Sequence, residues 1–271
     1  MVELVKRQVV ETRTKGTLAD LLRKAETGEC VHLCDHPAIQ GNQPHWCAYP
    51  EGVVVQQGER LLVNGDRTLF EGVFQDWRIA VDDPSRIFLL NKEKKMGPEY
   101  SVISDSEGNE ICRVESWWLH DWQACSAGVV TCRGERFHTC QTIELNAEKV
   151  LARMDSDEPG RWSIIPGTTD ILTQGRHCTF YKNGRVQKFN FEWHDLKDWH
   201  VSEKGFVFNE EDGAFSIIRW GKQKSAIHLA AQEQLVECDD WRDWQLHPNG
   251  IIIKSALSSS ANRYNLIVVK E

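Results

Sequence analysis

The chain has no long apolar run. No stretch of its 271 residues reaches the roughly 18 consecutive apolar residues that a membrane-spanning helix needs. The N-terminal segment, residues 1–16, alternates apolar and polar residues and lacks the apolar centre of a signal peptide. We therefore expect a cytoplasmic protein that has no membrane partner.

Positive charge is also scarce. The chain has 32 Lys and Arg residues against 40 Asp and Glu residues, which gives a net charge of −8. Broad nucleic-acid binding depends on Lys and Arg side chains that neutralise phosphates, so this composition excludes it. The densest basic stretch, Lys92–Lys95, is expected to be a solvated loop.

Familiar catalytic motifs are absent as well. The sequence has no Gly-x-Ser-x-Gly elbow, no P-loop and no Gly-x-Gly-x-x-Gly fingerprint. We expect no cofactor and favour a binding role over catalysis. A hydrolase or lyase stays a further possibility, with its site at a central channel. Its acid/base or metal-holding carboxylates would come from Glu192, Asp195, Asp239 and Asp240.

Tryptophan, in contrast, is abundant and regularly placed. Six of the 11 tryptophans open a short segment that rises into an apolar run, and they recur about every 40 residues. These six are Trp46, Trp77, Trp122, Trp162, Trp199 and Trp244. Aspartate precedes four of them, as Asp76, Asp121, Asp198 and Asp243. Self-similarity of this period is typical of repeat architectures.

Each repeat contains the elements of a four-stranded antiparallel sheet. Glycine, a turn residue, stands near the middle of five of the six segments. These glycines are Gly52, Gly128, Gly167, Gly205 and Gly250. In the second unit we expect further strands at 86–91, 100–104 and 110–116, with a hairpin turn at 105–109. Six such units predict an all-β, six-bladed β-propeller that forms a single domain over residues 1–271.

Two segments lie outside the repeats. Residues 17–27 predict a short helix, because Thr17 can cap it, leucines supply an apolar face, and Gly28 can end it. The last unit, from Asp243, holds only about three strands. A closed array must cover its open edges, so we expect an N-terminal strand near residues 4–11 to complete the last blade.

The repeated tryptophans carry a resemblance in general form to the β-propeller superfamily. The chain does not match the WD-repeat type, because its dipeptide is Asp-Trp and no paired Gly-His lies upstream. The Trp-x(4–5)-Gly opening is similar to lectin-like and other tryptophan-rich propellers. The resemblance implies the fold and carries over no catalytic residue.

The repeated tryptophans are expected to pack between neighbouring blades, because a large apolar ring suits a slot that recurs at a constant place. The aspartates before them would then bond a nearby turn or the backbone. In the alternative interpretation some of these rings form stacking platforms for sugars, which would make the protein a lectin-like carbohydrate-binding propeller.

The stretches that lead into three of the Asp-Trp pairs are rich in aromatic, acidic and histidine side chains. In a propeller these connections run from outer to inner strands and lie on one face, where they can hold a partner or ligand. The candidate residues are Trp117, Trp118, His120, Trp193, His194, Asp195, Asp240 and Trp241. We expect a protein partner first and a carbohydrate second; packing on the next blade is the alternative.

The nine cysteines are odd in number, and most stand singly in apolar strands, so we expect them to be reduced and buried. One cluster resembles a weak zinc site and consists of Cys30, Cys34, His36, His45 and Cys47. Strand alternation would place Cys30 and Cys34 on one face. We favour small core residues beside a loop histidine, and expect no metal.

Overall fold

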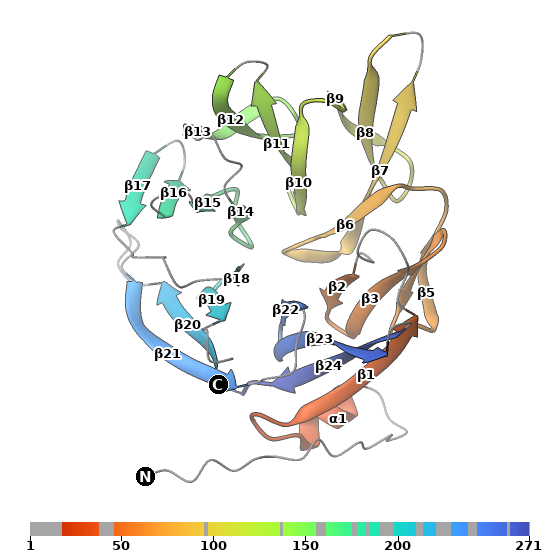
Figure 1. Ribbon diagram of the computed structural model, residues 1–271, viewed down its shortest axis with the longest axis vertical. Coiled ribbons are helices and arrows are strands. Elements are labelled where there is room, and N and C mark those ends of the chain that lie inside the picture. The colour runs from red at the N-terminus through yellow and green to blue at the C-terminus, as the bar shows by residue number, and fades with distance from the viewer. Residues whose placement is uncertain are drawn as a thin grey trace. The chain divides into compact units, whose positions relative to one another are not determined.

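The structure is a computed structural model (Figure 1). It describes residues 18–37, 46–94, 97–135, 138–155, 161–174, 178–182, 185–189, 198–209, 214–220, 229–237, 243–258 and 261–270. These residues form six four-stranded sheets and one helix, α1 (Leu18–Lys24). The all-β, six-bladed propeller with antiparallel blades is therefore confirmed.

Five sheets follow the chain order. The first holds β2 (Trp46–Tyr49), β3 (Gly52–Gln57), β4 (Arg60–Val63) and β5 (Arg67–Glu71). The second holds β6 (Asp76–Ala80), β7 (Asp83–Lys94), β8 (Glu99–Asp105) and β9 (Glu110–Glu115). The third holds β10 (Leu119–Cys125), β11 (Gly128–Glu135), β12 (His138–Leu145) and β13 (Lys149–Asp155). The fourth holds β14 (Arg161–Ile164), β15 (Ile171–Gln174), β16 (Cys178–Lys182) and β17 (Arg185–Phe189). The fifth holds β18 (Asp198–Ser202), β19 (Gly205–Asn209), β20 (Ala214–Trp220) and β21 (Leu229–Glu237).

The sixth sheet joins both ends of the chain. It holds β22 (Asp243–His247), β23 (Gly250–Ser258), β24 (Ala261–Val268) and, beside β24, β1 (Cys30–Pro37). An N-terminal strand thus completes the last blade, as expected, but its predicted position near residues 4–11 was wrong. Residues 4–11 lie outside the described part of the chain. The segment that pairs with β24 runs from Cys30 opposite Ile267 to Pro37 opposite Ala261.

The chain divides into two compact units. The terminal unit comprises Met1–Glu71 and Leu235–Glu271, and the middle unit comprises Gly72–Gln234. The first and sixth sheets belong to the terminal unit, whereas the second, third and fourth sheets belong to the middle unit. The single-domain assignment stays a prediction.

Helix α1 lies within the predicted range. Its residues Leu18 and Leu22 pack against the apolar core of the terminal unit. Gly28 follows with a positive φ of 85°, and its N–H donates to Val268 O at 2.7 Å. The helix itself ends at Lys24, before Gly28, and Gly28 ties the segment after the helix to β24.

The six repeated tryptophans are buried, as predicted, with exposed fractions between 0% and 6%. Each lies in the first strand of its sheet. The aspartates that precede these tryptophans make two kinds of hydrogen bond, one within the strand and one between sheets. Within the strand, the aspartate Oδ1 accepts from the backbone N–H of the tryptophan that follows, as in Asp121–Trp122 at 2.8 Å and Asp243–Trp244 at 3.0 Å. This local bond was expected and fixes the start of the strand.

A second bond links one sheet to the next, and the sequence did not predict it. Trp122 Nε1 donates to Asp76 Oδ2 of the preceding sheet at 2.8 Å, and Trp46 Nε1 donates to Asp243 Oδ2 at 2.7 Å. We call this pairing of an indole with the preceding sheet's acceptor the indole clasp. It satisfies a buried N–H donor that would otherwise cost about 1–3 kcal/mol.

Glutamine after the tryptophan adds further hydrogen bonds between neighbouring sheets. Gln123 Nε2 donates to Trp162 O at 2.9 Å while its Oε1 accepts from Ile164 N at 3.1 Å. Gln245 makes the equivalent pair of bonds to Trp46 O and Ala48 N, at 2.9 and 2.8 Å. Each glutamine amide thus donates one hydrogen bond to, and accepts one from, the backbone of the neighbouring sheet.

In the first and third sheets, the glycine of the repeat is required by a neighbouring asparagine. Asn146, in the turn after β12, folds its side chain back so that Oδ1 accepts from Val129 N at 2.9 Å. A Cβ on Gly128 would lie 2.2 Å from that oxygen, and the φ of Gly128 is +134°. Gly52 and Asn64 repeat the arrangement in the first sheet, where the corresponding distance is 2.0 Å.

We expect the stability of the protein to decrease in mild acid, in part through His247. Burial lowers the pKa of His247 below its ordinary value, and backbone hydrogen bonds offset only part of this. The unfolded chain therefore binds the proton more readily, so this stability is present above a pH of about 6.5 and is lost as pH falls further. His247→Asn should reduce the loss in urea unfolding between about pH 7.5 and 5.5; an unchanged pH dependence would contradict this role.

Candidate functional site

The connection between β9 and β10 is held rigidly on the middle unit. Ser116 N donates to Glu99 O at 2.8 Å, and the Ser116 and Ser101 hydroxyls share a hydrogen bond of 3.0 Å. Trp118 N donates to Glu115 O at 2.9 Å, and its Nε1 donates to Glu115 Oε2 at 3.1 Å. These hydrogen bonds fix the conformation of the turn.

Trp117 projects from this turn into solvent. Its side chain is 76% exposed, and it is the one exposed aromatic residue among those the structure describes. It borders a hollow of about 440 Å³ between the turn and the β7–β8 hairpin. The hollow is lined by Lys92, Lys94, Gly97, Pro98, Glu99, Ser116 and Trp117.

Two lysines give this hollow a basic side. Lys92 and Lys94 are exposed and belong to strand β7, so the prediction of a loop was wrong for them. The long β7–β8 pairing, in which Lys94 lies opposite Glu99, extends the strand beyond its apolar part. Lys92 Nζ pairs with Glu99 at 3.3 Å. An exposed indole therefore lies beside cationic groups.

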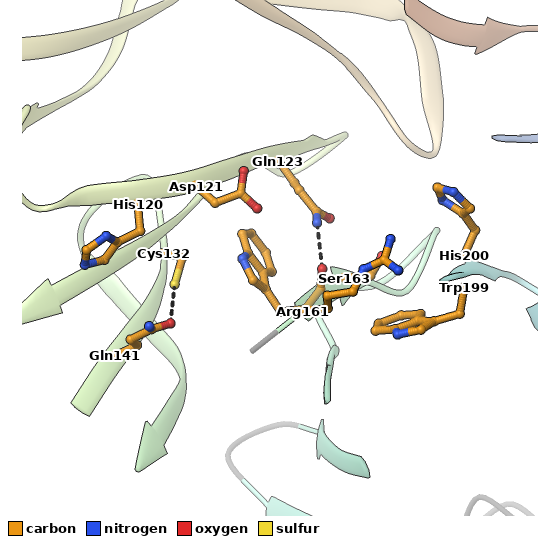
Figure 2. Close-up of a pocket in the computed structure, with 10 residues that line it drawn as sticks. His120, Asp121, Gln123, Cys132, Gln141, Arg161, Ser163, Trp199 and His200 are labelled. Atoms are coloured by element: carbon orange, nitrogen blue, oxygen red, sulfur yellow. Dashed lines mark hydrogen bonds between the residues drawn. The ribbon is translucent and has the colours of Figure 1, made fainter. Parts of the chain in front are cut away.

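A second cavity, of about 370 Å³, opens between β10, β14 and β18 in the middle unit (Figure 2). Its lining mixes charged, amide, imidazole, hydroxyl and indole groups. The lining residues are His120, Asp121, Gln123, Cys132, Gln141, Arg161, Trp162, Ser163, Trp199 and His200. A volume of this size falls in the usual range for small-molecule sites, about 300–1,000 Å³.

The indole clasp is open at this cavity. By the pattern of Asp76 with Trp122, the acceptor for Trp162 should be Asp121 of the preceding sheet. Trp162 Nε1 is nevertheless buried without a hydrogen-bond partner among the described residues. Both Asp121 and Trp162 line the cavity. The cavity therefore lies where a repeated contact of the fold is not made.

Arg161 replaces the repeat's aspartate at the same place. Its guanidinium pairs with Asp198 and lies 5.8 Å over the ring of Trp199. Because no carboxylate precedes Trp162, the indole of Trp199 donates to Gln174 Oε1 instead. Arg161 thus adds a positive charge to a cavity that otherwise contains one carboxylate, Asp121, among its lining residues.

The lining of the cavity includes one thiol, that of Cys132. Desolvation, with a smaller contribution from Asp121, raises the pKa of the Cys132 thiol to about 12, so this sulfur stays protonated. The thiol donates to Gln141 Oε1 at 3.3 Å, as Figure 2 shows. Glycosidase chemistry needs two carboxyl groups, and Asp121 supplies one.

His120 reaches this cavity from the start of β10. A Cβ placed on Gly134 would lie 2.0 Å from His120 Nε2, so the imidazole packs directly over that glycine. Of the predicted site residues, Trp117 and Trp118 thus lie in the turn between β9 and β10, and His120 lies at the start of β10. Trp117 and His120 border different hollows.

The other predicted site residues lie outside the described part of the chain. They are Trp193, His194, Asp195, Asp240 and Trp241, together with the carboxylates of Glu192 and Asp239. Sequence reasoning missed Arg161 and Gln141. The break in the Asp-Trp pattern at Arg161 was a signal that could have pointed to the cavity.

The candidate zinc ligands are not arranged as the alternation predicted. A bulge between His32 and Cys34 shifts the register of β1, so Cys30 and Cys34 lie on opposite faces. Burial raises the pKa of the Cys34 thiol to about 12. Among the described residues, no three His, Cys, Asp or Glu side chains lie close enough together to bind a metal ion. His36 and Cys47 are described and belong to no such group, while His45 lies outside the described residues.

No protein family and no curated protein matches the chain in sequence. In structure it is similar to a proposed oxidoreductase (glucose dehydrogenase) of Thermus thermophilus, with 8% identity, a TM-score of 0.46, and coverage of 87% of this chain and 99% of the other. It is also similar to BBS1N, solved in complex with ARL6DN, with 9% identity, a TM-score of 0.41, and coverage of 83% and 78%. Among the described residues, no helix could span a membrane.

Proposed function

We propose that the protein is a binding module that holds a protein partner through the β9–β10 connection, with Trp117 as the central anchor. The observation that carries this proposal is the exposure of one indole on a turn whose backbone and neighbours are fixed by hydrogen bonds. Exposed tryptophans of this kind dominate the binding energy of many interfaces. A fixed turn also reduces the entropy lost on binding.

The chemistry of the hollow indicates the kind of partner. Trp117 and Pro98 offer apolar surface, and Lys92 and Lys94 offer positive charge at the same rim. The whole chain carries a net charge of −8, so this basic rim is a local exception. We therefore expect the partner to present an apolar side chain next to acidic residues, in the cytoplasm as the sequence predicts.

A lectin-like role that uses the repeated tryptophans is less well supported. All six rings are buried, and Arg161 covers the face of Trp199. Sugar stacking needs an accessible ring face. Trp117 has an accessible ring face, but it stands outside the repeat. No other aromatic residue among those described is exposed in this way.

Replacing Trp117 should weaken partner binding without affecting the fold. A photo-crosslinking residue at position 117 identifies the partner in cells, and calorimetry with the purified partner then measures affinity. We expect Trp117→Ala to raise Kd by at least about tenfold, as for a central interface tryptophan. Its melting temperature should stay close to that of the parent, because the side chain is mostly in water.

Val186 provides the matched control, because it is 57% exposed on a different sheet, in β17. Val186→Ala should leave Kd unchanged. Lys94→Glu should weaken binding most at low ionic strength, where exposed charges are least screened. The proposal fails if a crosslinker at 117 captures nothing beyond what the same crosslinker captures at 186.

A further inference from the structure

We propose that the cavity between β10, β14 and β18 is a binding site for a carboxylate that carries a hydrogen-bond donor nearby, as in a small hydroxy acid or amino acid. The carboxylate would take the place of the missing acceptor in the open indole clasp. This site is separate from the Trp117 hollow and does not depend on the partner proposed above.

The first argument is the unpartnered donor. Trp162 is 6% exposed, and its Nε1 has no hydrogen-bond partner among the described residues. Leaving a buried N–H unsatisfied is costly, and native structures rarely do so without a reason. A cavity large enough for a small molecule borders this side chain. An acceptor that enters the cavity would remove the cost.

The second argument comes from the repeat itself. At two other junctions the same indole N–H meets a carboxylate oxygen, from Asp76 at 2.8 Å and from Asp243 at 2.7 Å. The fold therefore places this indole where a carboxylate can approach it. At Trp162 no such acceptor is supplied by the described residues, which makes a ligand carboxylate the matching group.

The third argument is the charge of the lining. Arg161 stands where four other repeats have aspartate, and its guanidinium, which also pairs with Asp198, lines the cavity next to Trp162. Guanidinium groups bind carboxylates strongly. Asp121 lines the cavity as well and can accept from a hydroxyl or ammonium group of the same ligand. Ligands with both features are hydroxy acids and amino acids.

Indole-nitrogen NMR tests this proposal on the full chain. The chain has 11 tryptophans, and Trp162→Phe assigns the signal of Trp162 by its disappearance. L-Lactate and L-serine are the probes, and their neutral amides, L-lactamide and L-serinamide, are the controls. A peptide with blocked termini and one glutamate is compared with the same peptide carrying glutamine. This comparison tests whether the bound carboxylate can belong to a polypeptide side chain. We expect the acids to shift the Trp162 signal saturably and the amides to leave it unchanged.

Trp162→Phe should lower the affinity for the acid, measured by calorimetry, by about tenfold or more, the usual effect of removing a hydrogen bond to a charged group. Trp46→Phe is the matched control, because Trp46 makes a closed clasp in the terminal unit. It should leave affinity unchanged. Binding of the glutamate peptide alone would support the carboxylate site and assign its source to a polypeptide.

The melting temperature checks that Trp162→Phe still folds. Phenylalanine keeps a buried aromatic ring but removes the five-membered ring with its unpartnered N–H, so this variant should melt below the parent protein and still unfold cooperatively. The proposal is overturned if no acid or peptide shifts the Trp162 signal at concentrations up to about 20 mM, well above the Kd of a weak site. Equal shifts from acids and amides would also overturn it.

Discussion

Asp243→Ala is expected to destabilise the protein by about 4 kcal/mol, because it leaves a buried lysine without its counter-charge. The Lys254 side chain is 7% exposed, and its Nζ lies 3.3 Å from Asp243 Oδ2. The same oxygen accepts from Trp46 Nε1 at 2.7 Å. The substitution thus leaves both the Lys254 ammonium group and the Trp46 indole N–H without this acceptor. Chemical unfolding measures the loss.

Asp76→Ala is the control for this prediction. It also opens an indole clasp, with Trp122, but the cation beside it, Arg78, is partly exposed and can turn to water. We expect a loss of about 1.5 kcal/mol. The double variant Asp243→Ala with Lys254→Met should recover most of the stability. Equal losses for Asp243→Ala and Asp76→Ala would show that the buried lysine is not the cause.

Gly128→Ala is expected to cost about 3 kcal/mol in the free energy of unfolding. A residue with a side chain is strained by about 1–3 kcal/mol at such a backbone angle, and the φ of Gly128 is +134°. The new Cβ would also lie 2.2 Å from Asn146 Oδ1, so that side chain must leave Val129 N. Losing this hydrogen bond adds about 1 kcal/mol.

Gly58→Ala is the control that separates the cost of backbone strain from the cost of a steric clash with a side chain. Gly58 has a φ of +62°, and a Cβ there meets nothing within 4 Å. Its cost should stay near 1–2 kcal/mol, the ordinary penalty for a left-handed residue with a side chain. Urea unfolding of both variants compares the two costs. If Gly128→Ala loses no more than Gly58→Ala, the packing of Asn146 is not what requires glycine.

The sequence predicted the fold well because its signal repeats. Tryptophan recurs at a fixed place in all six units, and glycine recurs near the middle of five of them. The hairpin at 105–109 was also predictable, since Asp105 accepts from Glu107 N and Asn109 N within the turn itself. Such contacts lie within a few residues and can be recognised from composition alone.

The closing strand could not be placed with the same certainty. Residues 4–11 and Cys30–Pro37 both alternate like strands, and local pattern does not decide which of them pairs with β24. The decision rests on a pairing such as Cys30 with Ile267, more than 200 residues away. The bulge at Leu33 was equally invisible, and it reversed the expected faces of Cys30 and Cys34.

The candidate site was predictable only where it departs from the repeat. Trp117 and His120 were identified because they interrupt the regular pattern. Arg161 departs from the pattern as well, but its meaning depends on the clasp between Asp76 and Trp122. That clasp joins neighbouring sheets, so no single unit reveals it. The open junction at Trp162 therefore needed the structure.

The indole clasp of Trp46 with Asp243 has a consequence for synthesis. The two residues are 197 positions apart, so β2–β5 leave the ribosome long before β22–β24 exist. The first sheet can form from β2–β5 alone, whereas β1 must wait for β24, and Trp46 must wait for its acceptor Asp243. Closing a loop of this length costs about 5 kcal/mol of chain entropy. A nascent chain that stops before Asp243 would leave β1 without its pairing strand β24 and accessible to chaperones and proteases.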